Sequence, residues 1–183
     1  MRLKTLAWTT AATVATAAAG GVATDPQGSW YLRLRKPDWQ PPAIAFPLVW
    51  TALYADLAVT SAVALDRAAE LDRAAELDRA AATPAGTSDP GGKGSRRELR
   101  AYRSALAANL VLNASWSWFF WRSRRPWLAA AEAALLAASS ADLVRRTYRL
   151  NRAAGVSLAP YAAWCGFATA LSTSIANLNS AKR

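Results

Sequence analysis

The 183-residue sequence predicts an all-α integral membrane protein, a bundle of five transmembrane helices in a single domain. Hydrophobic residues make up 53% of the chain and fall into five blocks. Each block is about 20 residues long, which is the length that a helix needs to cross the hydrocarbon core of a bilayer. The 22 Lys and Arg residues mostly flank these blocks, as the basic residues of membrane proteins do.

The first block, residues 5–24, is rich in Ala and Thr and follows Arg2 and Lys4. A basic start, an apolar middle and small residues near the end are also typical of a secretory signal. Trp8 near the start suits an anchor at the membrane interface and favours a transmembrane helix. We therefore expect a first span here, with the signal peptide as the alternative.

The second block, residues 43–65, contains one acidic residue, Asp56. Its Trp50, Tyr54 and Ser61 lie on one helix face. An ionisable residue inside a span is a candidate for a functional site. The alternative is that Asp56 lies at a shallow depth or packs against another helix.

The composition of residues 66–100 predicts a charged helical extension of the second helix, followed by a flexible loop. The motif Leu-Asp-Arg-Ala-Ala occurs three times, starting at residues 65, 71 and 77, and is rich in helix-forming residues. Its six-residue period rotates successive leucines by about 120°, which argues against a coiled coil. Residues 83–95 are rich in Pro, Gly, Ser and Thr, and this composition predicts the loop. The insertion either binds a partner outside the membrane or acts as a spacer.

The third block, residues 101–121, places Asn109, Asn113, Trp116 and Phe120 on one helix face. Amide side chains in hydrocarbon need hydrogen-bond partners. The two asparagines therefore bond neighbouring helices or meet a ligand.

The last two blocks are residues 126–144 and residues 157–178. The fourth is rich in Ala and Leu and contains Glu132 and Asp142. On the fifth, a single helix face is expected to carry Trp164, Ala168 and Ser172.

Composition excludes several kinds of site. The chain has no histidine, so imidazole bases, Ser-His and Cys-His pairs and the usual zinc and haem ligand are excluded; we expect no metal site. The single cysteine, Cys165, forms no intrachain disulfide. A net charge of +10 could suit nucleic acid, but the basic residues flank apolar blocks. We therefore expect a lipid bilayer as the partner and no nucleic acid.

Three motifs carry a resemblance to a known family. Residues 30–42 read WYLRLRKPDWQPP, whose prolines predict a rigid, ordered loop, and FPLVWTALY follows at residues 46–54. The third span contains LVLNASWS at residues 110–117, and the fifth contains PYAAWCGFAT at residues 160–169. In this order, the motifs resemble those of the TspO/MBR family, the tryptophan-rich sensory proteins or translocator proteins. The resemblance covers nearly the whole chain except residues 66–100.

The resemblance implies a five-helix bundle, usually a homodimer, that binds a small hydrophobic ligand under the first loop. No cofactor is required. The implied ligands are porphyrins such as protoporphyrin IX, haem-type tetrapyrroles, sterols and isoquinoline or benzodiazepine compounds. A metallated tetrapyrrole would find no imidazole axial ligand here. The motifs place eight residues at the ligand-binding site: Tyr31, Trp50, Tyr54, Asn113, Trp116, Ser117, Trp164 and Ala168.

The implied function is that of a cell-membrane receptor or sensor for such ligands, with transport as an extension of that role. One alternative is a light- and oxygen-dependent porphyrin-degrading enzyme that uses Trp50 and Trp164, although no acid–base constellation independently suggests catalysis. Another is a regulatory membrane protein that acts through residues 66–100. Two positions depart from the family pattern, because Asn109 replaces a common Gln and Ser172 replaces a common Asn.

Overall fold

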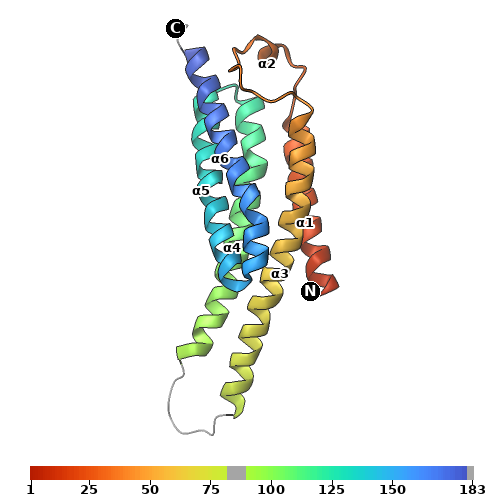
Figure 1. Ribbon diagram of the computed structural model, residues 1–183, viewed down its shortest axis with the longest axis vertical. Helices are drawn as coiled ribbons and strands as arrows, with labels where there is room; N and C mark the ends of the chain where they lie inside the picture. Colours follow the sequence, from red (N-terminus) through yellow and green to blue (C-terminus); the bar gives the residue numbers. More distant parts are fainter. Residues whose placement is uncertain (82–89, 181–183) are drawn as a thin grey trace.

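The computed structural model describes residues 1–81 and 90–180, which form helices without any strand (Figure 1). The all-α fold that the sequence predicts is confirmed. In chain order, the elements are α1 (Leu3–Ala23), α2 (Ser29–Arg33), α3 (Ala45–Ala81), α4 (Pro90–Ser117), the π-helix η1 (Trp118–Arg122), α5 (Pro126–Leu150) and α6 (Arg152–Ser180).

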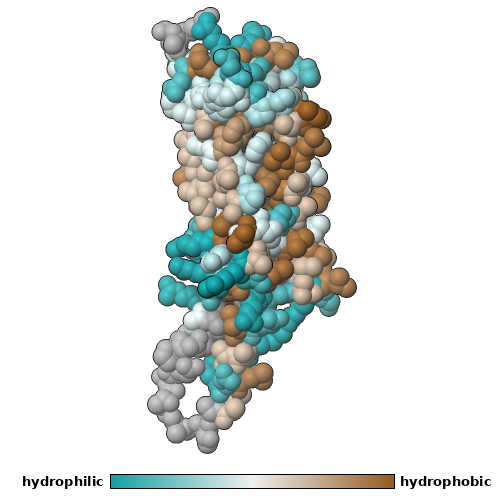
Figure 2. Space-filling view, viewed as in Figure 1, coloured by the Kyte–Doolittle hydropathy of each residue, from teal (hydrophilic) through white to brown (hydrophobic). Residues whose placement is uncertain are grey.

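The long helices run side by side along the longest axis of the molecule (Figure 1). The chain starts at one end of the bundle and finishes at the other, as an odd number of crossings requires. The loop that carries α2 lies at the end where α6 finishes, and the α4–α5 turn lies at this end too. Figure 2 shows hydrophobic side chains over the middle of the bundle and hydrophilic side chains toward its ends.

Among the described residues, four helices are long and apolar enough to cross a membrane, namely α1, α3, α5 and α6. Helix α4 is long as well, but it begins with charged residues, and the apolar stretch that follows continues into η1. The hydrophobic length of this fifth segment is therefore divided between two elements.

Two boundaries differ from the expectations. The segment from Ser29 to Arg33 forms the short helix α2 instead of loop, because the prolines that disfavour helix begin only at Pro37. Helix α4 begins at Pro90, although the flexible loop was expected to continue to residue 95. The part of that loop at residues 83–89 lies outside the described residues.

Helix α3 continues without a break from the bundle into the repeat segment. Leu65 and Ala68 are buried, whereas Leu71 and Leu77 are 37% and 71% exposed. The extension is therefore packed only in its first turns. Beyond them, Arg96 of α4 forms ion pairs with Glu76 and, at 3.9 Å, with Asp72.

Only Asn151 separates α5 from α6. Its side-chain Oδ1 accepts a hydrogen bond from the Ala154 amide at 3.0 Å and caps the start of α6. A Cβ atom at Gly155 would lie 2.4 Å from the Cα of Tyr148. Glycine is therefore needed where the two helices come closest.

Candidate ligand-binding site

Five aromatic rings gather where the first loop meets the end of α4. The ring of Phe120 is buried and lies 5.4 Å from the ring of Trp116 in a stacked arrangement. It also contacts Trp30 at 5.6 Å, Tyr31 at 6.2 Å and Trp121 at 5.1 Å, all edge-on. We call these five residues the outer aromatic cluster.

Two of these rings, those of Phe120 and Trp121, belong to the π-helix η1. A π-helical turn is wider than an α-helical turn and is often found at functional sites. Phe120 and Trp121 are neighbours in η1, yet both contact Tyr31; the Tyr31 and Trp121 rings are 4.6 Å apart. Two successive aromatic residues of η1 therefore contact the same part of the loop.

A second group, the α6 aromatic cluster, connects the first loop and α3 with α6. Trp164 stacks on Phe167 with a centroid distance of 4.8 Å. Phe46 lies 6.0 Å from Trp164, and Trp39 of the loop lies 5.8 Å from Phe167. Trp39 thus packs on α6, just as Trp30 packs on Phe120 of η1.

The loop is also attached to α6 by its backbone. Asn179 donates a hydrogen bond to the carbonyl oxygen of Arg35 at 2.9 Å and accepts one from its amide at 3.0 Å. The Gln40 side chain donates to the Tyr31 hydroxyl at 3.2 Å. These contacts fix the loop over the ends of the helices.

Deeper in the bundle, a chain of side-chain hydrogen bonds joins α3, α4, α5 and α6. The Tyr54 hydroxyl donates to Asn113 Oδ1 at 2.5 Å, and Asn113 Nδ2 donates to the Tyr161 hydroxyl at 3.0 Å. The Tyr161 hydroxyl donates to Asn109 Oδ1 at 2.7 Å, and Asn109 Nδ2 donates to Ser140 Oγ at 3.0 Å. We call this series the polar chain.

The polar chain is next to aromatic side chains of α3. Trp50 stacks on Tyr54 at 5.2 Å and contacts Tyr161 edge-on at 6.3 Å. Tyr161, Asn109 and Asn113 are all buried. The residues present at this level therefore combine flat apolar surfaces with a few oriented polar groups.

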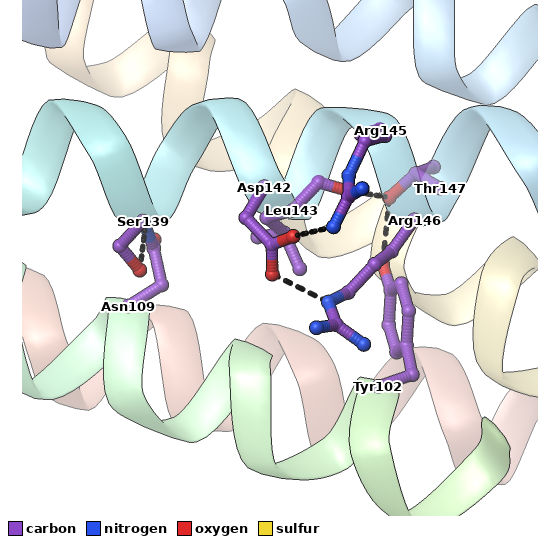
Figure 3. Close-up of polar contacts among 8 residues, drawn as sticks. All are labelled: Tyr102, Asn109, Ser139, Asp142, Leu143, Arg145, Arg146 and Thr147. Atoms are coloured by element: carbon purple, nitrogen blue, oxygen red, sulfur yellow. Dashed lines mark hydrogen bonds and ion pairs between the residues drawn. The ribbon is translucent and has the colours of Figure 1, made fainter.

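The α4–α5 interface carries further polar contacts toward the opposite end of the bundle (Figure 3). Asn109 also donates to Ser139 Oγ at 3.2 Å, and Tyr102 and Thr147 share a hydrogen bond of 3.0 Å. Asp142 pairs with two arginines of the next turn, Arg145 and Arg146. The hydrogen bonds of Asn109 and Tyr102 connect α4 to α5, whereas the ion pairs of Asp142 lie within α5.

One polar atom among the aromatic rings lacks a partner. The indole N–H of Trp116 is buried and makes no hydrogen bond within the described part of the chain. By contrast, the indole of Trp118 donates to the Ala19 carbonyl oxygen at 3.1 Å, and that of Trp127 donates to Ser180 Oγ at 2.8 Å. Buried indole N–H groups usually find an acceptor, so Trp116 is an exception.

Comparison with known proteins shows the family of the chain. The model of the TspO/MBR family matches residues 8–178. The chain belongs to the TspO/MBR family. It is 28% identical over 150 residues to the uncharacterized membrane protein YtaB of Bacillus subtilis, covering 82% of this chain and 80% of that protein. It is 27% identical to the tryptophan-rich protein TspO of Chlorobaculum tepidum over 88% of this chain and 87% of that one. It is 29% identical to the tryptophan-rich sensory protein of Cereibacter sphaeroides over 82% and 77%.

As a TspO/MBR protein with several long apolar helices, the chain is a multi-pass integral membrane protein. Of the eight residues that the motifs select, six take part in the contacts described above: Tyr31, Trp50, Tyr54, Asn113, Trp116 and Trp164. Ser117 instead faces α1, because a Cβ atom at Gly20 would lie 3.1 Å from its Oγ. Ala168 is half-buried one turn after Trp164.

Several contacting residues were not among the eight. Tyr161 occupies the centre of the polar chain, and Phe46 and Phe167 supply rings to the α6 aromatic cluster. The spacing of residues within the TspO/MBR motifs could have indicated two of them. Tyr161 stands three residues before Trp164, and Phe46 stands four residues before Trp50, so each pair shares a helix face.

Asp56, the acidic residue of the second span, lies away from the rings. Its Oδ1 accepts a hydrogen bond from Ser157 of α6 at 2.5 Å. This contact corresponds to the alternative in which Asp56 packs against another helix.

Proposed function

We propose that this TspO/MBR protein is a membrane receptor or sensor that binds a porphyrin or a related flat hydrophobic molecule. The ligand would lie between the first loop and the polar chain, among the rings of the two aromatic clusters. Two kinds of support point this way. The chemistry of the site suits a flat apolar ligand, and one relative is named a tryptophan-rich sensory protein.

The observation that carries the proposal is the buried indole N–H of Trp116, which has no partner within the described residues. Its ring stacks on Phe120 in the middle of the outer aromatic cluster. A polar group buried without a hydrogen bond costs free energy. A ligand that offered an acceptor at this position would remove that cost and gain orientation.

The polar chain would form the base of such a site. It ties four helices together through hydrogen bonds among the side chains of Tyr54, Asn113, Tyr161, Asn109 and Ser140. Because both asparagines are buried and bonded to protein groups, they are held in fixed orientations. The base would therefore keep its shape when a ligand enters.

The aromatic clusters would change on binding. Their rings contact one another at centroid distances of 4.6–6.2 Å. A ligand that enters must separate some of these pairs and replace ring–ring contacts with ring–ligand contacts. Since the sequence has no histidine, stacking and burial, rather than an imidazole ligand, would hold a metallated tetrapyrrole.

The test is a titration of the purified protein in neutral detergent with protoporphyrin IX in the dark, followed by the porphyrin absorption band. We expect saturable binding. Trp164→Ala, which removes a stacking ring, should weaken it. Trp116→Phe, which removes only the N–H group, should weaken it by about 2- to 10-fold, the value of one hydrogen bond.

The matched control is Trp8→Phe. Trp8 is 59% exposed on α1 and belongs to neither cluster, so its replacement should leave the affinity unchanged. Non-saturable uptake of porphyrin, equal in all four proteins, would refute the proposal. Illumination of the same samples then separates simple binding from the degradation that the resemblance implies for Trp50 and Trp164.

A further inference from the structure

A small polar cavity adjoins the outer aromatic cluster at the end of the bundle. It has a volume of about 100 Å³ and is lined by seven residues of the first loop, α2, η1 and the α4–α5 turn. Trp30, Tyr31 and Trp121 belong to both the cavity and the cluster. The remaining lining residues are Asp25, Gly28, Ser29 and Arg124.

We propose that this cavity binds a carboxylate group of the ligand and that Arg124 is the residue that selects it. The inference rests on the proposed function, because it assumes that a flat ligand occupies the aromatic cluster. It adds the chemical class of that ligand, a flat molecule with an anionic arm at its edge. A neutral flat molecule of the same size is the competitor that the site would disfavour.

Arg124 is held in an unusual position. Its φ angle is +53°, the one positive value for a non-glycine residue in the described part of the chain. This left-handed conformation costs about 1 kcal/mol or more for an ordinary residue. The turn between η1 and α5 therefore keeps its shape at a cost, and that shape brings Arg124 to the cavity.

The guanidinium group of Arg124 is free to bind an anion. It forms no ion pair or hydrogen bond within residues 1–81 and 90–180. Nearby arginines differ from it, because Arg122 lies over the ring of Trp118 at 5.8 Å and Arg125 does not line the cavity. A guanidinium group offers several N–H donors in one plane, which match a carboxylate.

Asp25 is the one lining residue that would oppose an anion. Its carboxylate packs against the backbone of the loop, since a Cβ atom at Gly28 would lie 2.4 Å from Asp25 Oδ2. The same turn is closed by a hydrogen bond of 3.2 Å from the Gly28 amide to the Asp25 carbonyl oxygen. Asp25 forms no ion pair with Arg124 at 4 Å or less. Its charge therefore weakens the site without occupying the guanidinium group.

The size of the cavity fits this role. A volume of about 100 Å³ corresponds to about three molecules of liquid water at ~30 Å³ each. A carboxylate with a short alkyl arm has a similar volume, whereas a tetrapyrrole ring does not fit. The ring would therefore lie among Trp30, Tyr31 and Trp121, and only its edge would reach Arg124.

The experiment compares protoporphyrin IX, which carries two carboxylates, with its dimethyl ester, which carries none. Both are titrated against the full-length protein in neutral detergent. The unmodified protein should bind the diacid more tightly. In Arg124→Gln, the affinity for the diacid should fall by about 1.5- to 5-fold, the value of a partly exposed charge pair, while the affinity for the ester should not change. Arg125→Gln, with the same change of charge one residue away, should have no effect on either.

Two further variants make the test independent of folding effects. Asp25→Asn should raise the affinity for the diacid and leave the ester unaffected. Arg124→Gly relieves the left-handed backbone, so it should be at least as stable as the unmodified protein and still lose the preference for the diacid.

The outcomes separate the two proposals. Equal binding of diacid and ester by the unmodified protein, or an equal loss with Arg124→Gln and Arg125→Gln, would overturn the role of Arg124 and leave the receptor function in place. Failure of both porphyrins to bind would overturn the proposed function itself.

Discussion

Tyr161→Phe tests whether the polar chain stabilises the bundle. Tyr161 is fully buried, and its hydroxyl group makes two hydrogen bonds. It donates to Asn109 Oδ1 at 2.7 Å and accepts from Asn113 Nδ2 at 3.0 Å. Phenylalanine keeps the ring and removes only the hydroxyl group. The substitution therefore leaves one amide oxygen and one amide N–H group unpaired inside the membrane.

The expected cost follows from these two bonds. Hydrogen bonds between transmembrane helices contribute about 0.6 kcal/mol on average and about 1.7 kcal/mol at most. Two lost bonds should therefore lower the free energy of unfolding by roughly 1 to 3 kcal/mol. The edge-on contact between the rings of Trp50 and residue 161 should remain. The expected change in the free energy of unfolding therefore includes no contribution from lost packing.

The assay is unfolding in mixed micelles with increasing SDS, followed by near-UV circular dichroism. Tyr148→Phe is the matched control, because Tyr148 is 44% exposed and its hydroxyl group makes no hydrogen bond within the described residues. Its loss should change the free energy of unfolding by less than about 0.5 kcal/mol. If Tyr161→Phe destabilised the protein no more than this control, the polar chain would not be a stabilising element.

Two further predictions concern packing and the insertion. Gly155→Ala should destabilise the bundle by about 1 to 3 kcal/mol in the same unfolding assay, because the new Cβ atom would lie 2.4 Å from Tyr148 Cα. Gly166→Ala is the control, because its Cβ atom meets nothing within 4 Å, and the gain in helix propensity should leave the stability unchanged or raise it by up to about 1 kcal/mol. Equal effects of the two substitutions would contradict the close α5–α6 approach. Replacing residues 71–97 with a short Gly-Ser linker should leave porphyrin affinity unchanged, because the extension projects from the end opposite the aromatic clusters (Figure 1). A large loss of affinity in this deletion would assign the insertion a role in binding.

Helical periodicity predicted which face of each helix points into the bundle, because this period depends only on the geometry of the single helix. Asn109 and Asn113 are one turn apart, and both point into the bundle, where they bond neighbouring helices. That matches one of the two alternatives expected for buried amides. The period does not identify the partner on the next helix, so the hydrogen bond from Tyr54 to Asn113 could not be derived from spacing.

The α-helical period does not apply to the π-helix η1. An α-helix continued through Phe120 and Trp121 would turn these neighbours by about 100° relative to each other. In η1 both rings contact Tyr31, and helical periodicity does not predict where a π-helical turn occurs. Ser117 was selected by the family motif and not by periodicity, and its Oγ faces α1 at Gly20.

The two sides of the proposed site are held by different forces, and this difference has consequences for binding. The base depends on directional hydrogen bonds among buried side chains, such as that between Tyr161 and Asn109. The loop side depends on ring packing and on the attachment of Arg35 to Asn179. Ring contacts adapt to a new flat surface, whereas a broken buried hydrogen bond is costly. Ligand entry should therefore separate the loop from the helices and leave the base intact. Substitutions on the loop side should mainly change ligand affinity, and substitutions in the base should mainly change the stability of the fold.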